Sequence, residues 1–331
     1  MGTTAFVLAT EPVGPAYRAT AGMSVFYFFS TGIIALTAIA YLFPSSWRTL
    51  YLITTLPTLF FIVAILPFIS ESPHWYLIRR KPEKALEIMR SISKKNGRFL
   101  PDRVSLVLDC DKSHSNTNNI ADVAISGSII DVIRSSLTRW RLVLSTIISL
   151  FCSVTYYGLT LNVVNLKTNL YISVVINSVC ELPAFTLATI LLERFGCRKL
   201  VIGTMWFGGA FCMAGSLMGG DGAMAVGRMV CSVLGIFGIS ATYNLLLVYT
   251  TELFPTTVRN AALGCIQQAE QIGAVVAPMV VVMGQGLPLM VFGLCGIVGG
   301  VMSFYLPETF NQPLYDTMAG MEDGEKAREG A

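Results

Sequence analysis

Eight long apolar runs divide this chain, and each is long enough to cross a lipid bilayer as an α-helix, which takes about 20 apolar residues. Charged residues make up 13% of the 331 residues, against about 25% in an average soluble domain, and they crowd between the runs. A helix satisfies its backbone hydrogen bonds internally, as lipid requires. We therefore expect an all-α membrane protein with about eight transmembrane helices, at residues 21–42, 50–69, 142–161, 170–192, 200–218, 225–250, 261–283 and 287–306.

The distribution of lysine and arginine predicts the orientation of these helices. An even number of spans places both ends of the chain on one side of the membrane. With both ends in the cytosol, only Arg48, Lys167 and Arg228 lie on or near the outer side, and the other 20 of the 23 basic residues face the cytosol. Because basic residues favour cytosolic loops, we expect both termini to be cytosolic.

Two junctions of the chain share one pattern. The sequences E-P-V-G-P-A-Y-R, at 11–18, and E-L-F-P-T-T-V-R, at 252–259, each contain an acid, a proline-containing turn and an arginine seven residues after the acid. The sequences E-S-P-H-W-Y-L and P-E-T-F-N-Q-P-L-Y each follow the second span after one of these junctions. Such repetition indicates a membrane protein built by duplication, as in secondary transporters.

The two repeated units differ in size, because six spans belong to the second unit and only two to the first. We expect a partial N-terminal half-bundle at 1–70, made of the end of one helix plus two spans, and a six-helix C-terminal half-bundle at 142–306. Residues 71–141 then form a cytosolic loop between the halves, and 307–331 form a cytosolic tail. The front helices of the first unit are expected to be missing.

One stretch of the long loop, at 81–95, has the pattern of an amphipathic helix. Its apolar residues cluster at helical spacing against a basic face. These apolar residues are Leu86, Ile88, Met89 and Ile92. We interpret the basic residues as a solvated face that follows the same bias of positive charge toward the cytosol.

Several motifs, taken together, carry a family resemblance. In E-L-F-P-T-T-V-R-N, E-S-P-H-W-Y-L, L-P-E-T-F-N-Q-P-L-Y-D-T and E-R-F-G-C-R-K-L the chain resembles the major facilitator superfamily. It resembles most closely the organic cation/carnitine transporter group, particularly the plant members, because V-C-E-L-P-A, G-R-M-V and Y-Y-G-L-T-L-N-V also fit. The resemblance covers the last eight of the family's twelve spans and implies an N-terminally truncated major facilitator-type helical bundle. Sugar porters share related signatures and are the nearest alternative.

The cytosolic motifs contain charged residues that the resemblance implies are gating charges. The turn glycine Gly196 would present the charges of E-R-F-G-C-R-K-L together, and pairs that form and break as two halves rock would act as latches. The alternative is topology anchoring with charge compensation at helix ends. His74 stands where the family usually has arginine, which would weaken the latch in the first half. The candidate gating charges are Glu11, Arg18, Glu71, Glu193, Arg194, Arg198, Glu252, Arg259 and Glu308.

An acid within a span is a candidate for contact with substrate. Glu181 lies mid-span, where an ionised acid costs roughly 2.5–3.5 kcal/mol, so it should face a polar cavity or a partner. The alternative is a protonated, hydrogen-bonded structural glutamate. The resemblance suggests Arg228 as the partner of Glu181, although Arg228 would also suit interfacial snorkelling.

Two further pairs of residues are candidates for the substrate site. Glu270 and Gln271 precede Ile-Gly in the seventh span, and the neutral Gln271 departs from the charged residue that the resemblance leads us to expect. Glu270 could serve a cation instead or pair near the cytosolic edge. Tyr156 and Tyr157 lie mid-span, about 100 degrees apart on a helix, so that one could offer an aromatic face to a quaternary ammonium ion. Ordinary packing is the alternative for both tyrosines.

Other functional classes find no support in the sequence. Two histidines and the absence of C-x-x-C argue against a metal site, and there is no phosphate-binding G-x-x-x-x-G-K-[ST] loop. We expect no cofactor, no metal, no nucleic acid and no enzymatic activity. The expected partners are a small organic solute, the lipid bilayer, and a proton or sodium ion for coupling. Plasma membrane and vacuolar membrane are both compatible.

Two hypotheses about function remain open. The first is a secondary active or facilitative carrier of organic cations or zwitterions such as carnitine, working by alternating access, with a sugar-porter-like carrier as its variant. The second is a truncated, non-transporting membrane protein, because a carrier cavity needs both six-helix walls.

Overall fold

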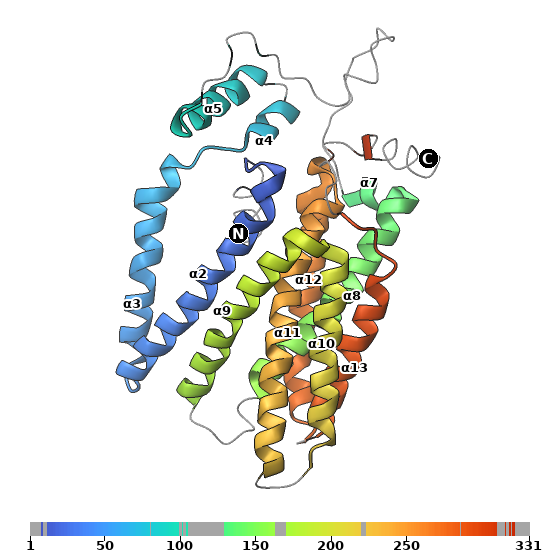
Figure 1. Ribbon diagram of the computed structural model, residues 1–331. Coiled ribbons are helices and arrows are strands. Elements are labelled where there is room, and N and C mark those ends of the chain that lie inside the picture. The colour runs from blue at the N-terminus through green and yellow to red at the C-terminus, as the bar shows by residue number, and fades with distance from the viewer. Residues whose placement is uncertain are drawn as a thin grey trace.

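The computed structural model shows a helical protein whose long helices run side by side (Figure 1). All regular structure in the part of the chain that it describes is helical. The described residues are 8, 12–79, 81–98, 101, 104, 129–162, 170–219, 223–284, 286–309, 315, 318 and 320–321.

The front of the described chain forms two long segments joined by a short turn. Helix α2 (Pro15–Leu42) starts with a proline in its first turn, where the missing N–H has no helical partner to lose. Helix α3 (Trp47–Phe60) contains Pro57, and it continues as a π-helical turn, Phe61–Ile65, and a 3₁₀ turn, Leu66–Phe68. A proline lacks the N–H that would bond to the carbonyl four residues earlier, so Pro57 and Pro67 both interrupt the regular hydrogen-bond pattern of this segment.

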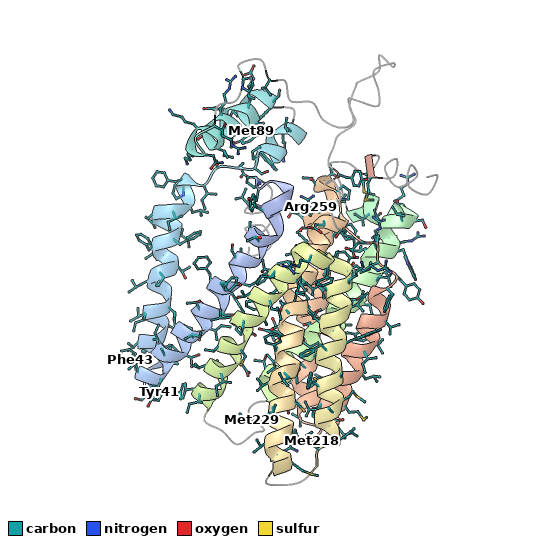
Figure 2. All side chains as sticks on the ribbon, in the orientation of Figure 1. Tyr41, Phe43, Met89, Met218, Met229 and Arg259 are labelled. Carbon is teal, nitrogen blue, oxygen red and sulfur yellow. The ribbon has the colours of Figure 1, made fainter. Side chains whose placement is uncertain are left out.

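Two short helices follow the second span and lie beyond the same end of the bundle as the start of α2 (Figure 1). These are α4 (Pro73–Ile78) and α5 (Pro82–Lys95). The amphipathic helix predicted at 81–95 is therefore confirmed as α5. Its residue Met89 is marked in Figure 2, above the end of the second span.

Six long helices, preceded by the short α7 (Ile129–Arg134), form the rest of the bundle. In chain order they are α8 (Ser136–Asn162), α9 (Leu170–Phe195), α10 (Cys197–Leu217), α11 (Ala223–Leu253), α12 (Thr256–Val281) and α13 (Leu287–Ser303). The closest pairs are α8 with α12 and α10 with both α11 and α13. The predicted turn glycine, Gly196, separates α9 from α10 with a φ of +83°, a conformation that glycine adopts without steric cost.

Glycines bring α10 and α13 close together. A Cβ atom added at Gly296 would lie 2.9 Å from the Cα of Gly209, and one added at Gly209 would lie 3.0 Å from the carbonyl oxygen of Gly293. Small residues at such crossings allow backbone-to-backbone contact, which drives helix association where lipid removes the hydrophobic difference.

Each predicted span is a helix in the structure, with ends that differ by a few residues. Among the described residues, 6 helical segments have the length and hydropathy of a membrane span: Thr20–Leu42, Trp47–Phe68, Ser136–Asn162, Val174–Leu192, Cys197–Leu217 and Met224–Leu253. Helix α13 is apolar but only 17 residues long. Helix α12 is long enough but carries Arg259 and Glu270, both buried, so its sequence is less apolar.

The front pair of spans contacts the six-helix group through α2. The rings of Tyr41 and Tyr171 meet edge to face at 5.8 Å near one end of α2, and Tyr27 meets Phe185 at 6.0 Å nearer the middle. The next segment, Trp47–Phe68, contains no buried residue. Helix α2 thus runs along α9, and α3 stands outside it (Figure 1).

Candidate functional site

Three tyrosines meet inside the bundle, and we call Tyr156, Tyr157 and Tyr243 the tyrosine cluster. Tyr156 and Tyr157 are neighbours on α8, and Tyr243 comes from α11. The rings of Tyr156 and Tyr243 are stacked with centroids 4.9 Å apart and an interplanar angle of 20°. The ring of Tyr157 stands edge-on to both others, at 5.3 Å and 6.2 Å.

Glu181 of α9 lies on one side of the tyrosine cluster. The hydroxyl of Tyr156 donates a hydrogen bond of 2.7 Å to Oε1 of Glu181, and the hydroxyl of Ser30 on α2 donates one of 2.9 Å to Oε2. The side chain is 3% exposed. Pro183 follows two residues later and lacks an N–H, so the helix is locally polar at this point. One carboxylate therefore joins three helices: α2, α8 and α9.

Glu270 of α12 lies on the other side of the tyrosine cluster. The hydroxyl of Tyr243 donates a hydrogen bond of 3.1 Å to Oε2 of Glu270. The backbone carbonyl of Glu270 accepts a hydrogen bond of 2.5 Å from Ser153 on α8, where Gly273 also allows close approach. Glu270 is 4% exposed and lies fourteen residues into α12, about 21 Å from its start. It therefore lies near the middle of α12 and not near either end of the helix.

Two carboxylates thus flank a stack of aromatic rings in the middle of an apolar bundle. Ionised carboxylates and tyrosine faces both attract cations, and a cation over a tyrosine face gains about 0.5–2 kcal/mol. Hydroxyl groups within the same cluster also provide donors and acceptors for a neutral polar solute.

The other predicted substrate-site residues lie apart from this cluster. Gln271 is exposed, on a different face of α12 from the buried Glu270. Arg228 is half-buried in the second turn of α11, and Met229 beside it lies near the end of the bundle opposite α5 (Figure 2). Tyr243 follows Arg228 by fifteen residues, about 22 Å along the helix. The hydrogen-bond partners of Glu181 are Ser30 and Tyr156, so the pairing with Arg228 is not formed; helix depth separates the two.

Ser30 and Tyr243 were not predicted as members of the site. Both occur in polar interruptions of apolar spans: S-T in α2, and S-A-T-Y-N in α11. Such interruptions are the sequence signal that could have identified them, because polar side chains within a span usually face the protein interior.

A second polar cluster ties together the ends of α10 and α11 and the segment after α13. Glu252 accepts hydrogen bonds from the hydroxyl of Thr309, at 2.7 Å, and from the thiol of Cys197, at 3.3 Å. Glu308 accepts from the backbone N–H of Arg198 at 3.4 Å, and the Arg198 guanidinium donates to the carbonyl of Phe304. We use the name end cluster for five of these residues: Cys197, Arg198, Glu252, Glu308 and Thr309.

The remaining candidate gating charges have different surroundings. Arg259 is 2% exposed in the first turn of α12, whereas Glu71 and Arg194 are exposed. Glu11 lies outside the described residues. Arg18 belongs to α2 and Glu193 belongs to α9. The structure thus brings Arg198, Glu252 and Glu308 together and leaves Glu71 and Arg194 in solvent-accessible positions.

Long apolar helices that bury carboxylates against tyrosines define an integral, multi-pass membrane protein. The chain belongs to the sugar (and other) transporter family, whose family model matches residues 14–319. The description of this family names its members as transporters.

Curated relatives include organic cation carriers. The chain is 55% identical over 325 residues to organic cation/carnitine transporter 4 of Arabidopsis thaliana, covering 98% of this chain and 61% of the relative. It is 32% identical over 328 residues to a solute carrier family 22 member 15-like protein of Xenopus laevis, covering 97% and 65%. The chain therefore spans less than two thirds of the length of these relatives. The resemblance to the organic cation/carnitine group is confirmed.

Solved structures confirm the fold. The major facilitator superfamily proton:xylose symporter XylE, bound to 6-bromo-6-deoxy-D-glucose, superposes with a TM-score of 0.70 at 18% identity, covering 96% of this chain and 70% of XylE. An inward-open structure of XylE from E. coli gives 0.57, covering 95% and 68%. The expected major facilitator-type helical bundle is therefore present.

Proposed function

We propose that the protein carries small organic cations, or zwitterions such as carnitine, across a membrane by alternating access, as a secondary active or facilitative transporter. The observation that carries this proposal is the pair of buried carboxylates, Glu181 and Glu270, on either side of the tyrosine cluster. The names of the relatives add support for the substrate class. A proton or sodium ion is the proposed coupling ion.

The energetics of burial favour a cation as the solute. An ionised carboxylate inside a membrane span costs roughly 2.5–3.5 kcal/mol, and among the described residues the hydrogen-bond partners of the two carboxylates are neutral hydroxyl groups. A cation between them would offset that cost, and the stacked rings of Tyr156 and Tyr243 would add an attraction to the same charge. A neutral sugar would gain hydrogen bonds but would leave the carboxylate charges uncompensated.

The same contacts suggest how binding could be coupled to movement. We propose that residues 1–70 and 142–306 belong to two units that rock against each other, with 71–141 and 307–331 as the connecting loop and tail. The hydrogen bond from Ser30 to Glu181 joins α2 of the first unit to α9 of the second. A cation that takes over the Glu181 carboxylate would weaken this bond. The end cluster would then hold α10, α11 and the segment after α13 as one body during the motion.

We further propose that α4, α5 and both termini lie on the cytosolic side of the membrane. The membrane itself would be either the plasma membrane or the vacuolar membrane. The support is the charge distribution, with 20 of 23 basic residues on that side. Figure 1 shows α4, α5 and α7 at one end of the bundle, as this topology requires.

One observation favours a second candidate function, a non-transporting membrane protein that associates with another chain. The segment Trp47–Phe68 contains no buried residue. Among the described residues, α2 is the long helix that it contacts, and these contacts are few. Such a helix gains little from this chain alone, and another protein could cover it.

Uptake measurements test both candidates. The 331-residue chain and a version extended at its N-terminus by the family's remaining helices would be reconstituted in liposomes at equal protein content. We expect the 331-residue chain to take up labelled tetraethylammonium or carnitine in a saturable manner. We expect it not to take up labelled xylose. Uptake by the longer version alone would favour the non-transporting candidate. Xylose uptake without cation uptake would refute the proposed substrate class.

A further inference from the structure

A cavity of about 430 Å³ lies between α5, α4 and the end of the second span, away from the tyrosine cluster. Within α5, the lining residues recur at spacings of three and four and so occupy one face of the helix. Ser70, two residues after the second span ends, and Tyr76 of α4 complete the walls. From α5 the lining residues are Lys84, Glu87, Ile88, Ser91, Ile92 and Lys95.

The charges in this cavity have a definite pattern. Lys84 and Lys95 supply two positive charges, and Glu87 supplies one negative charge between them along the helix. Hydroxyl groups of Ser70, Ser91 and Tyr76 add donors and acceptors. A complementary ligand would therefore carry two negative groups and one positive group.

A second cavity, of about 390 Å³, adjoins the first and is more apolar. The two share Ser70, Ile88 and Ile92. Phe68, the last residue of the second span, and Ile69, the residue after it, line the second cavity together with Leu8. Glu71 also lines it and adds one negative charge at its polar side. A charged cavity that opens beside an apolar one, at the level where a span ends, fits an amphiphile whose polar group is joined to a hydrocarbon chain.

We propose that these two cavities form a binding site for a phosphatidylserine-type phospholipid. Its phosphate and carboxylate would pair with Lys84 and Lys95, its ammonium with Glu87, and the start of an acyl chain would lie against Phe68 and Ile88. The site stands apart from the transport proposal but shares its cytosolic placement of α5, on the side where membranes carry their anionic lipids. The basic face of this helix is then a lipid contact, which goes beyond the solvated surface that the sequence suggested.

The test uses the full 331-residue chain in detergent, titrated with dioctanoyl phosphatidylserine, phosphatidylglycerol and phosphatidylcholine and with soluble phosphoserine. Binding is followed by microscale thermophoresis. The site variant is Lys84→Gln with Lys95→Gln. Its matched control is Lys81→Gln with Lys94→Gln, which removes the same charge from exposed lysines of the same segment that do not line the cavity. A third variant, Ser91→Trp, fills the cavity without changing the charge.

We expect phosphatidylserine to bind more tightly than the other two lipids and phosphoserine to bind weakly. The site variant should lose about 25-fold in affinity, because each of its two lysines near an anionic lipid contributes about a factor of five. The control pair should change the affinity less than threefold, and Ser91→Trp should abolish binding. Equal losses in the two lysine pairs, equal binding of phosphatidylglycerol, or phosphoserine binding as tight as the lipid would each overturn the proposal.

Discussion

Replacing Glu181 by glutamine tests the central contact of the proposed site with little change in shape. Glu181 accepts one hydrogen bond at each carboxylate oxygen, from Tyr156 and from Ser30. Glutamine keeps one acceptor oxygen and replaces the other with an NH₂ group, which cannot accept. The NH₂ group can instead donate to the hydroxyl oxygen that faces it, so the variant can keep both contacts but converts both from charged to neutral hydrogen bonds.

The magnitude follows from the two bonds. A hydrogen bond to a charged group contributes about 1.5–3 kcal/mol, and one between neutral groups about 0.5–1.5 kcal/mol. The links from Glu181 to α2 and α8 should therefore weaken by roughly 2–3 kcal/mol in total. A cation would also lose its charged partner, so KM for tetraethylammonium should rise at least about tenfold, which corresponds to about 1.4 kcal/mol.

The assay is initial-rate uptake of labelled tetraethylammonium in liposomes containing equal amounts of each variant. Tyr156→Phe is measured alone and combined with Glu181→Gln, because a double-mutant cycle isolates the contribution of the contact itself. Glu83→Gln, on the exposed surface of α5, is the matched control and should leave the kinetics unchanged.

The refuting result is equally concrete. If Glu181 is a protonated structural residue, glutamine reproduces its neutral form, and both KM and the maximal rate will equal those of the parent protein. Additive effects of Glu181→Gln and Tyr156→Phe would show that the two side chains do not act together. The first outcome would remove Glu181 from the substrate site, and the second would show that its contact with Tyr156 does not contribute to binding.

Three further predictions concern other parts of the structure. Tyr243→Phe removes the hydroxyl that holds the second buried carboxylate and should raise KM for the cation about three- to tenfold in the same uptake assay, whereas unchanged kinetics would exclude that carboxylate. Gly296→Ala should lower stability by about 1–3 kcal/mol, seen as a lower thermal midpoint, because its Cβ would meet backbone at 2.9 Å; Gly203→Ala, with open space around it, should not. Thr309→Val should speed the labelling of buried Cys197 by thiol reagents, since it releases a 2.7 Å hydrogen bond in the end cluster; an unchanged labelling rate would contradict this role.

The sequence predicted the helices well because their signal is local. Each apolar run by itself indicates a segment that can span lipid. The spacing of Leu86, Ile88, Met89 and Ile92 was likewise enough to predict α5. Helix ends were less predictable, since polar first turns such as that of α8 continue the helix beyond the apolar run. The π-helical turn between Pro57 and Pro67 depends on how the two prolines are accommodated, which composition does not specify.

The candidate site was predicted only in part because its contacts are not local. A buried acid such as Glu181 is visible in the sequence, since its cost in lipid demands a partner. The identity of that partner is not, because Ser30 and Glu181 are 151 residues apart and meet through the depth and rotation of two separate helices. The same reasoning explains the pairing with Arg228 that the structure does not form: both residues are polar within spans, but they lie at different depths.

The two glutamates differ in what they connect, and this difference bears on how a carrier of this kind could work. Glu270 reaches Tyr243 and Ser153, which belong to the six-helix group that also contains its own helix. Glu181 reaches Tyr156 within that group but also Ser30 of α2, outside it. A solute held between the two carboxylates would therefore compete with only one contact that joins α2 to the six-helix group. A ligand shifts a conformational equilibrium only through contacts that differ between the states, and under the proposed function the bond from Ser30 to Glu181 would be such a contact. Under the proposed function, Glu181 would therefore convert binding free energy into movement of α2, whereas Glu270 would contribute to affinity alone.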